Sequence, residues 1–281
     1  MISVKNLQFS YTKAAFIEDV SFDVSPGEIF GFLGPSGAGK STLQKILTGL
    51  LTDYSGNVTV NGEEAKGRKN SFYENIGVDF EFPSLYEKLT AYENLKFFAS
   101  LYKKQRDINA LLTSVGLIND ANKKVSDYSK GMKSRLNFIK ALLHDPALLF
   151  LDEPTSGLDP SNSRVMKDLI LSEKKAGKTI ILTTHNMFDA TELCDRVAFI
   201  VDGKIRALDT PHHLIMSKGA SKIMYTYLEN GKERSAEIPT NQTAEDKQLM
   251  QLIQKNQLLS IHSGEPTLND LFVELTGRQL Q

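Results

Sequence analysis

The sequence contains one cysteine, no excess of either charge and no long apolar run, and each shortage excludes a class of protein. A single cysteine, Cys194, excludes a disulfide within the chain and a cysteine-rich metal site. Its surroundings predict a buried packing residue in place of a reactive thiol. Lysine and arginine total 33 against 34 for aspartate and glutamate, so the overall charge does not favour nucleic acid or an anionic membrane surface as a partner.

Apolar residues never continue for the roughly 18 positions that a membrane-spanning helix needs. The first residues also lack the apolar core of a signal peptide. We therefore expect a cytoplasmic protein that does not itself insert into a membrane. With 281 residues, the chain can bury a substantial core in one large or two smaller domains.

Residues 34–41 carry the strongest signal, because they follow the pattern G-x-x-x-x-G-K-[ST]. An apolar run at 29–33 precedes them, and a helical pattern at 42–50 follows. Glycines let the backbone turn its N–H groups toward one centre, and the helix adds its positive N-terminal end. This predicts a phosphate-binding loop in which Lys40 reaches the β and γ phosphates and Ser41 ligates Mg²⁺. A glycine-rich surface turn, the alternative, needs neither the strand nor the helix.

A second apolar run, residues 148–151, ends in the acidic pair Asp152 and Glu153. Two adjacent carboxylates at a strand end are costly to keep charged unless a cation neutralises them. We therefore expect Asp152 to hold the Mg²⁺ shell and Glu153 to polarise a water aimed at the γ-phosphate. The alternative, a solvated acidic turn, is disfavoured by the presence of the phosphate loop.

The first sixty residues alternate like half-buried strands at 2–4, 20–24 and 58–60, which predicts an antiparallel sheet around the phosphate-loop strand. Residues 89–143 then follow a helical period, with Gly116 ending one of the helices. We therefore expect a helical insertion subdomain, placed at about residues 84–145.

Beyond the insertion, apolar runs at 148–151, 179–182 and 197–201 are separated by helical segments such as 160–175. Strands spaced by helices predict a parallel α/β core.

The last sixty or so residues differ from this pattern and predict a small α+β accessory module. An Asn-Gly turn at 230–231 joins two strand-like runs into a hairpin, and a helical stretch near 248–254 follows. Thr267 and Asp270 resemble a capping box, and they precede a helix with four apolar residues on one face: Leu268, Leu271, Phe272 and Leu275.

Three further segments stand with the two motifs described above in the order found in the ATP-binding cassette (ABC) ATPases, and the sequence resembles that family. Residues 128–132, Tyr-Ser-Lys-Gly-Met, stand at the place of the family signature, usually written LSGGQ. Residues 156–159 resemble the D-loop, and His185 stands at the switch histidine. The resemblance implies an α/β fold with a P-loop NTPase core, an ABC ATPase domain at 1–215 and the accessory module at 216–281.

The resemblance also implies ATP and Mg²⁺ as cofactors and a site shared between two subunits. Ser129 and the Gly131 N–H would contact the γ-phosphate of ATP held by the second subunit, while Asp159 would join the two sites. Tyr11 lies where the family stacks an aromatic ring on adenine, with Phe9 and Phe16 as the rival rings. The implied catalytic residues are Glu153 and His185, and the nucleotide-binding set is Tyr11, Gly34, Pro35, Ser36, Gly37, Ala38, Gly39, Lys40, Ser41, Thr42, Ser129, Gly131 and Asp159.

The sequence departs from the family pattern at the Q-loop position and within the signature. Glu81 falls where the family has its Q-loop glutamine, with Asp79 as the other candidate. A carboxylate oxygen suits Mg²⁺, which gives Ser41, Asp152 and Glu81 as the expected metal ligands. In the signature, Lys130 replaces a glycine, and it faces either the phosphates of the partner or solvent.

The Tyr-Ser-Lys-Gly-Met signature and the 266–277 tail resemble exporter ATPases that work with separately encoded permeases, often for drugs, peptides or lipid-linked compounds. We therefore expect the ATPase subunit of a membrane exporter, a homodimer bound through residues 82–95 to an integral-membrane permease at the inner face of the cell membrane. Nucleic acid is not an expected partner. Two alternatives are a weakly hydrolysing regulatory subunit paired with an active one and a soluble ABC ATPase not engaged in transport.

Overall fold

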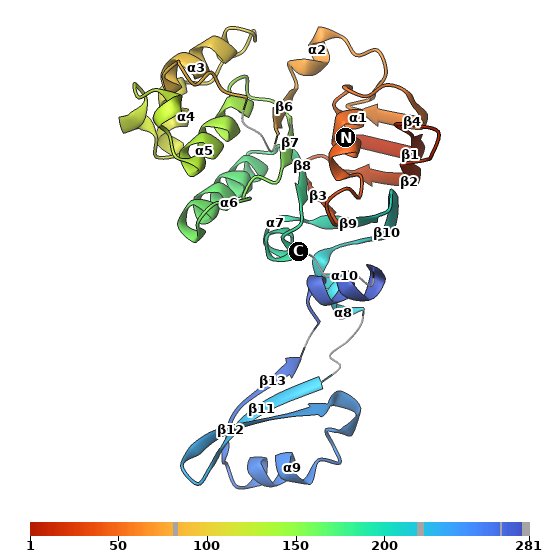
Figure 1. Cartoon of the computed structure of the whole chain (residues 1–281). Coiled ribbons are helices and arrows are strands. Elements are labelled where there is room, and N and C mark those ends of the chain that lie inside the picture. The colour runs from red at the N-terminus through yellow and green to blue at the C-terminus, as the bar shows by residue number, and fades with distance from the viewer. Residues whose placement is uncertain (81–83, 218–221, 265, 277–281) are drawn as a thin grey trace. The chain divides into compact units, whose positions relative to one another are not determined.

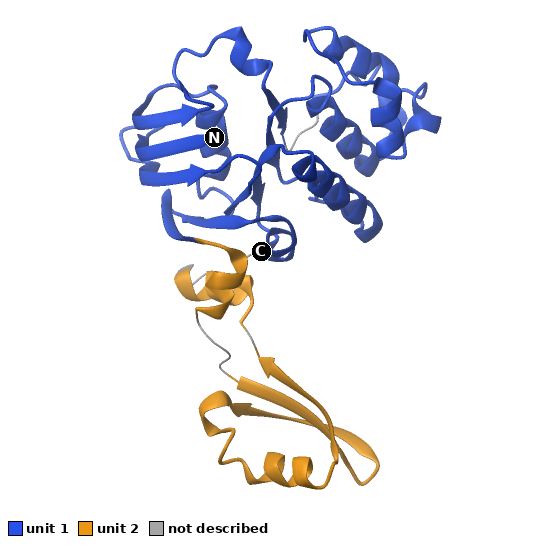
Figure 2. Ribbon diagram, turned by 180° about the vertical axis from the view of Figure 1, so that it is seen from behind, with its two compact units in different colours: residues 1–208, 281 blue, residues 209–280 orange. Residues whose placement is uncertain are grey.

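The computed structural model describes residues 1–80, 84–217, 222–264 and 266–276. Within it the chain divides into two compact units, residues 1–208 and residues 209–280 (Figure 2). Glu81, which the sequence places at the Q-loop position, lies outside the described residues. None of the helices in the described part of the chain combines the length and the apolar character needed to cross a membrane.

The first unit opens with a four-stranded sheet in the order β2-β1-β4-β5. Strand β1 lies antiparallel to both of its neighbours, with Val4 opposite Phe22 on one side and Val58 on the other. Alternate residues of these strands are buried, so the predicted antiparallel subdomain is confirmed. The strands are β1 (Ile2–Phe9), β2 (Ile17–Val24), β4 (Tyr54–Val60) and β5 (Glu63–Glu64).

A second sheet, in the order β10-β9-β3-β8-β7-β6, forms the α/β core of this unit. Strands β6, β7, β8, β3 and β9 pair in parallel along that order, so their carboxyl ends share one edge of the sheet. The register brings the last residues of these strands to the same level, because Leu33 of β3 pairs with Thr184 of β8, and Asp152 of β7 pairs with Thr183. The strands are β3 (Ile29–Leu33), β6 (Ile76–Asp79), β7 (Leu148–Asp152), β8 (Thr179–Thr184), β9 (Arg196–Val201) and β10 (Lys204–Asp209).

Helices of the first unit connect these strands and build the insertion (Figure 1). Helix α1 ends at Leu47, earlier than the helical pattern predicts, and Leu50 is 58% exposed instead of packing on the sheet. The insertion holds α3, α4 and α5, which pack on one another as expected. The helices are α1 (Lys40–Leu47), α2 (Asn70–Tyr73), α3 (Ala91–Ala99), α4 (Ile108–Ser114), α5 (Lys130–Ala141), α6 (Pro160–Lys175) and α7 (Met187–Leu193).

Cys194 follows α7 and is 8% exposed, with its Sγ directed at Gly31 of β3. A Cβ on Gly31 would lie 2.7 Å from this sulfur, so the thiol fills the space that the glycine leaves. Burial raises the pKa of the Cys194 thiol, which keeps it protonated. The prediction of a packing cysteine is confirmed.

The second unit contains the predicted hairpin and one strand that the sequence did not predict. Its sheet has the order β12-β11-β13, and α9 covers one face through Leu249 and Leu252, which pack on Tyr225. The expected boundary after residue 215 falls inside α8. The elements are α8 (Pro211–Met216), β11 (Lys222–Glu229), β12 (Lys232–Pro239), α9 (Lys247–Gln254), β13 (Leu258–Gly264) and α10 (Leu268–Thr276).

The predicted capping box precedes α10. Thr267 and Asp270 exchange hydrogen bonds, since the Thr267 N–H donates to Asp270 at 2.8 Å and the Asp270 N–H donates to Thr267 Oγ1 at 3.2 Å. Leu268, Leu271 and Phe272 are buried. Leu275 is 42% exposed, so the apolar face predicted for this helix is buried only over its first part.

Candidate nucleotide site

The phosphate loop joins β3 to α1, and its backbone takes a path that only glycine permits at two points. A Cβ on Gly34 would overlap the carbonyl oxygen of Ile200 in β9. Gly39 has φ +112°, and a Cβ there would lie 2.6 Å from the Ile17 side chain. The sequence therefore needs glycine at both ends of this turn, because any side chain would push the loop off the sheet edge.

Lys40 begins α1 and turns its side chain back over the loop. Its Nζ donates to the carbonyl oxygens of Gly34 at 2.7 Å and Pro35 at 3.1 Å, and the residue is 8% exposed. The ammonium is thus held at the centre of the turn. The N-terminus of α1 adds the positive end of its dipole at the same place, so the loop presents a concentrated positive potential.

A cavity of about 280 Å³ opens over this loop. It collects residues from the loop, from the ends of β7 and β8, and from the turn before β2. They are Phe16, Ser36, Gly37, Gly39, Lys40, Ser41, Thr42, Asp152, Glu153 and His185. Residues more than a hundred positions apart in the sequence meet here because β3, β7 and β8 are neighbours whose carboxyl ends share one sheet edge. Gly34, Pro35 and Ala38 belong to the loop without lining the cavity, and Ala38 is buried.

The acidic pair at the end of β7 is held by β8. Asp152 is 8% exposed and accepts a hydrogen bond from the Thr183 hydroxyl. The Glu153 N–H donates to the Thr183 carbonyl oxygen at 3.0 Å, and Glu153 has φ +53°. A residue other than glycine rarely adopts this conformation, which costs about 1–3 kcal/mol and persists where the surroundings enforce it.

Glu153 and His185 form a pair at the cavity. Glu153 Oε1 lies 2.9 Å from His185 Nδ1, and the glutamate side chain is 12% exposed against 48% for the histidine. The carboxylate therefore lies deep in the site while the imidazole lies at its opening. Because the contact uses Nδ1, the Nε2 atom of His185 is left for a partner in the cavity.

The donor set fits the expected cofactors. Ser41 and Asp152 offer a hydroxyl and a carboxylate oxygen to the same cavity, and hard oxygen donors are the ligands that Mg²⁺ prefers. A loop whose glycine positions admit no Cβ, with Lys40 folded over it, matches the size and charge of a phosphate chain.

The aromatic residues near the loop take distinct positions. Phe9 is buried, whereas Tyr11 is 56% exposed and its hydroxyl lies 3.0 Å from Thr42 Oγ1. Phe16 lines the cavity and packs edge-on against Tyr11 with ring centroids 5.3 Å apart. Tyr11 and Phe16 are thus the rings within reach of a base, and the stacking role of Tyr11 stays a prediction.

The signature segment lies apart from this cavity. Ser129 is the N-cap of α5, and its Oγ accepts from the Met132 N–H at 3.3 Å. Asp159 is the N-cap of α6 and accepts from the Ser161 N–H at 3.1 Å. Gly131 approaches the start of α6, since a Cβ on it would lie 3.5 Å from Asn162 Nδ2. The structure does not bring Ser129, Gly131 or Asp159 to the phosphate loop of the same chain.

Lys130 adopts a position that neither predicted orientation describes fully. It is exposed to solvent, yet its side chain folds over Gly157 of the D-loop in its own chain, where a Cβ would overlap the ammonium. It also lines a second cavity, of about 320 Å³, together with Lys133. Asp152 and Glu153 line both cavities, so this second space lies directly beside the acidic pair.

Asp79 ends β6 in the second cavity. It is 5% exposed and accepts a hydrogen bond from Asn137 of α5, a residue that no sequence motif indicated. Burial, with a smaller contribution from the charge of Asp152, raises the pKa of the Asp79 carboxyl to about 7, although Lys140 and the Asn137 hydrogen bond act in the opposite direction. The buried carboxyl two residues before Glu81 therefore joins the sheet to the helical insertion.

Comparisons with known proteins show what this chain is similar to. Residues 17–156 match the family model described as ABC transporter. The chain is 50% identical over 284 residues to a fluoroquinolones export ATP-binding protein of Mycobacterium tuberculosis (strain CDC 1551 / Oshkosh), covering 100% of this chain and 94% of the relative. It is 33% identical over 298 residues to Nod factor export ATP-binding protein I of Rhizobium johnstonii, covering 100% of this chain and 96% of that protein.

Among solved structures, the ATP-binding subunit of an ABC transporter matches with a TM-score of 0.70 and 30% identity, covering 78% of this chain and 93% of that one. This match confirms the predicted fold class. Neither the family model nor these relatives supports the two alternative functions that the sequence left open. With half of its residues identical to an ABC export ATP-binding protein along its whole length, the chain belongs to the ABC transporter family, among its ATP-binding proteins.

Proposed function

We propose that this chain is the ATP-hydrolysing subunit of an ABC exporter. The observation that carries the proposal is the single cavity around which Lys40, Ser41, Asp152, Glu153 and His185 meet. These residues come from the ends of neighbouring parallel strands, so their arrangement follows from the sheet order.

Each residue has a physical part in the hydrolysis. Lys40 and the N–H groups of the loop hold the β and γ phosphates, and Glu153 takes a proton from the attacking water. His185, held through Nδ1 by Glu153, presents Nε2 to the γ-phosphate. Mg²⁺ held by Ser41 and Asp152 would neutralise charge that develops on the phosphate oxygens.

The proposal includes a second subunit because of α5, the signature helix that follows Ser129. Ser129 is exposed and begins a helix of 12 residues, whose N-terminal N–H groups favour an anion. Because Ser129 and Gly131 do not reach the phosphate loop of their own chain, two copies are needed to complete each site. A homodimer with two shared ATP sites satisfies this need by two-fold symmetry.

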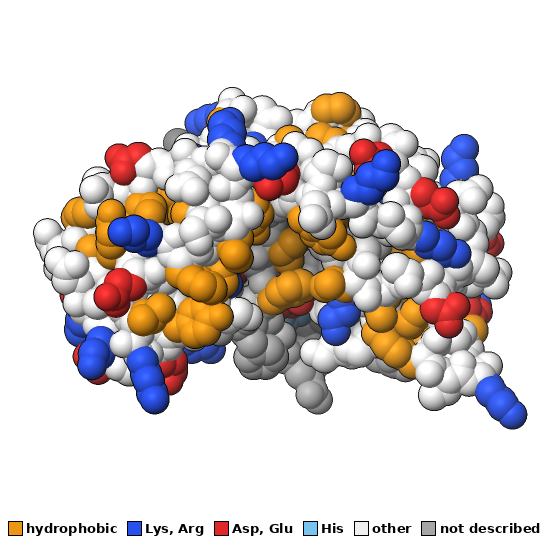
Figure 3. Space-filling model, turned by 90° about the horizontal axis from the view of Figure 1, so that it is seen from above, with side chains coloured by type: hydrophobic (Ala, Val, Ile, Leu, Met, Phe, Trp, Pro, Cys, Tyr) orange, Lys and Arg blue, Asp and Glu red, His pale blue; other side chains and the backbone are white. Residues whose placement is uncertain are grey.

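An apolar groove supports a permease as the membrane partner. A cavity of about 320 Å³ lies between the sheet and the insertion, and Leu50, Tyr73 and Leu101 around it are 58%, 39% and 63% exposed. Figure 3 shows apolar side chains gathered around a hollow on this side of the first unit. An exposed apolar patch of this kind marks an interaction surface, here for a segment of an integral-membrane permease that holds the chain at the inner membrane face.

Export of a drug-like compound is the proposed output, by similarity to the fluoroquinolone export relatives. The compound would bind the permease, and ATP binding and hydrolysis would shift the dimer between closed and open states. With the permease present, a transported fluoroquinolone should raise the rate of ATP hydrolysis.

Phosphate release from MgATP tests the proposal. Lys40→Ala should lose most ATP binding and hydrolysis, because it removes the ammonium at the centre of the loop. Lys45→Ala is the matched control, since Lys45 lies exposed on the same helix and should keep the parent rate. Equal rates for the two variants would overturn the assignment of the site.

A further inference from the structure

Asp189 is a buried residue whose carboxylate contacts the segment that supplies the acid of the site and whose backbone N–H contacts the segment that supplies the histidine. It is the third residue of α7 and is 4% exposed. Its Oδ2 accepts a hydrogen bond from the Thr155 hydroxyl at 2.6 Å. Thr155 follows Glu153 by two residues, so this bond fixes the loop that leaves the acidic pair.

The switch segment, residues 184–186, is joined to Asp189 through the backbone at the start of α7. Asn186 is the N-cap of α7, and its Oδ1 accepts from the Asp189 N–H at 3.3 Å. The Asn186 N–H in turn donates to Thr184 Oγ1 at 3.0 Å. His185 lies between these two residues, so its backbone is held on both sides.

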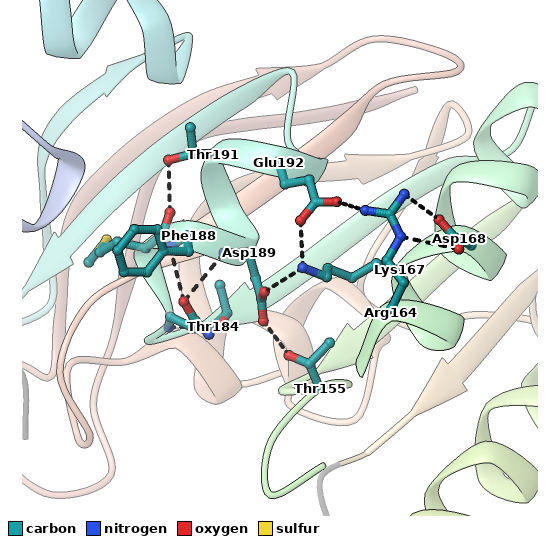
Figure 4. Close-up of polar contacts among 11 residues, drawn as sticks. Thr155, Arg164, Lys167, Asp168, Thr184, Phe188, Asp189, Thr191 and Glu192 are labelled. Carbon is teal, nitrogen blue, oxygen red and sulfur yellow. Dashed lines mark hydrogen bonds and ion pairs between the residues drawn. The ribbon is translucent and has the colours of Figure 1, made fainter. Parts of the chain in front are cut away.

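The negative charge of Asp189 is balanced from α6. Lys167 Nζ lies 3.4 Å from Asp189 Oδ1 and 2.5 Å from Glu192 Oε2, and its side chain is 15% exposed. Arg164 then joins Glu192 to Asp168 at the surface of the network. Figure 4 shows Asp189 between Thr155 on one side and Lys167 on the other.

The carboxylate of Asp189 joins the loop after Glu153 to α6, the helix that follows the D-loop, and its backbone N–H joins the switch segment. A buried carboxylate is costly to hold unless it is both hydrogen-bonded and paired with a cation, and Asp189 has both partners. Removing the Thr155 hydroxyl would leave an acceptor of the buried charge unsatisfied, which moves one segment relative to the other.

We propose that Asp189 is a positioning residue for ATP hydrolysis, which sets the distance between Glu153 and His185 through Thr155 and links that pair to α6 through Lys167. The inference rests on the proposed ATPase function. The Glu153–His185 contact of 2.9 Å joins side chains from the two segments that Asp189 holds. A misplacement of about 1 Å by residues outside the chemistry can cost about 100-fold in rate.

Kinetics of the full chain separate positioning from a general structural role. Thr155→Val keeps the shape of the side chain and removes the hydroxyl, so kcat should fall about tenfold while KM for ATP changes less than twofold. Thr155→Ser restores the donor and should recover most of the rate. The double variant Asp189→Ala/Thr155→Val should lower kcat no further than Asp189→Ala alone, because both changes break the same contact.

Asp168→Asn is the matched control, since it alters a 55% exposed carboxylate that pairs with Arg164, and it should leave kcat unchanged. A Thr155→Val variant with the parent kcat would overturn the inference. So would a Thr155→Ser variant that is no faster than Thr155→Val.

Amide hydrogen exchange gives a readout that does not depend on turnover. In Thr155→Val, amides of residues 153–158 and of residues 184–189 should exchange faster together, because one contact holds both segments. Faster exchange in residues 153–158 alone would overturn the link to the switch segment. A parent chain without ATP hydrolysis would refute the proposed function separately, and the exchange result would still decide whether Asp189 couples the two segments.

Discussion

At the scale of single residues, the carboxylates of Asp152 and Glu153 already have hydrogen-bond or ion-pair partners within the chain. Glu153 adopts a positive φ, receives His185 at 2.9 Å and is anchored to β8 through its own N–H. The Asp152 carboxylate accepts a hydrogen bond from the Thr183 hydroxyl. The acidic pair therefore reaches the cavity in a fixed orientation, which lowers the cost of organising the site during reaction.

His144 provides a pH-dependent contribution to stability at the residue scale. It is 2% exposed, stacks on Tyr102 with ring centroids 3.8 Å apart, and its Nε2 lies 2.8 Å from the Ile76 carbonyl oxygen. Burial lowers the pKa of His144, although the Ile76 hydrogen bond and the charges of Glu74 and Asp145 oppose this effect. The neutral ring is thus the folded form, with Nε2–H donating to Ile76.

The direction of the pH effect follows from this lowered pKa. As the pH falls through the unfolded value of about 6.5, the unfolded chain binds a proton before the folded chain does. The contribution of His144 to the free energy of unfolding is complete above that pH and declines below it. Urea unfolding at about pH 7.5 and pH 5.5 measures this effect. Between the two, the free energy of unfolding should fall less for His144→Gln than for the parent. His212→Gln, at an exposed histidine, should keep the parent difference, and equal losses in both variants would contradict the account.

At the scale of elements, periodicity and capping predicted most of the fold. Pro160 to Lys175 forms one helix as the pattern indicates, because Asp159 caps it and a proline occupies its first position. The end of α1 was predicted wrongly, since Leu50 continues the apolar period beyond the point where the helix stops. Strand β13 was missed because most of its side chains are exposed, so it lacks the alternation of a half-buried strand, and its pairing with β11 is also interrupted by a register shift between Thr226 and Tyr227.

The capping box of α3 allows a local test at this scale. The Glu93 N–H donates to Thr90 Oγ1 at 3.2 Å, and the Thr90 N–H donates to Glu93 Oε2 at 2.8 Å. Thr90→Ala should cost about 1 kcal/mol of local stability, because one N–H at the helix start loses its acceptor. Amides in the first turn of α3 should then exchange about fivefold faster.

Thr113→Ala is the control for this change, since the Thr113 hydroxyl bonds to the Asn109 carbonyl oxygen within its own helix, α4. Exchange in α3 should be unaffected by it. An unchanged rate in Thr90→Ala would show that packing alone holds the start of α3.

The site could be predicted in part because its motifs are local in sequence. The loop at 34–41 was found from its motif and the pair Asp152 and Glu153 from the apolar run that it ends, and the structure places them around one cavity. The contacts of Asp79 with Asn137 and of Asp189 with Thr155 were not predicted, because each joins residues from distant segments that carry no shared motif. Strand order and register, which a pattern along one segment does not contain, bring them together.

At the scale of the whole molecule, the family assignment predicted from five motifs in order is confirmed by the relatives that span the full chain. The proposed dimer and permease follow from features that one chain leaves incomplete. The signature helix lies away from the phosphate loop of its own chain, and the groove beside the insertion exposes apolar side chains. The proposed function therefore belongs to an assembly, with each chain contributing half of two sites.

Glu153→Gln gives the most direct measurement of the central claim that Glu153 is the general base of ATP hydrolysis. The change keeps size and removes the carboxylate that accepts the proton, so kcat should fall at least about 100-fold. ATP binding should stay within about threefold, because Lys40 and the loop remain intact. Glu64→Gln, at an exposed glutamate of β5, serves as the control and should hydrolyse like the parent. Parent-like hydrolysis of MgATP by Glu153→Gln would contradict the account.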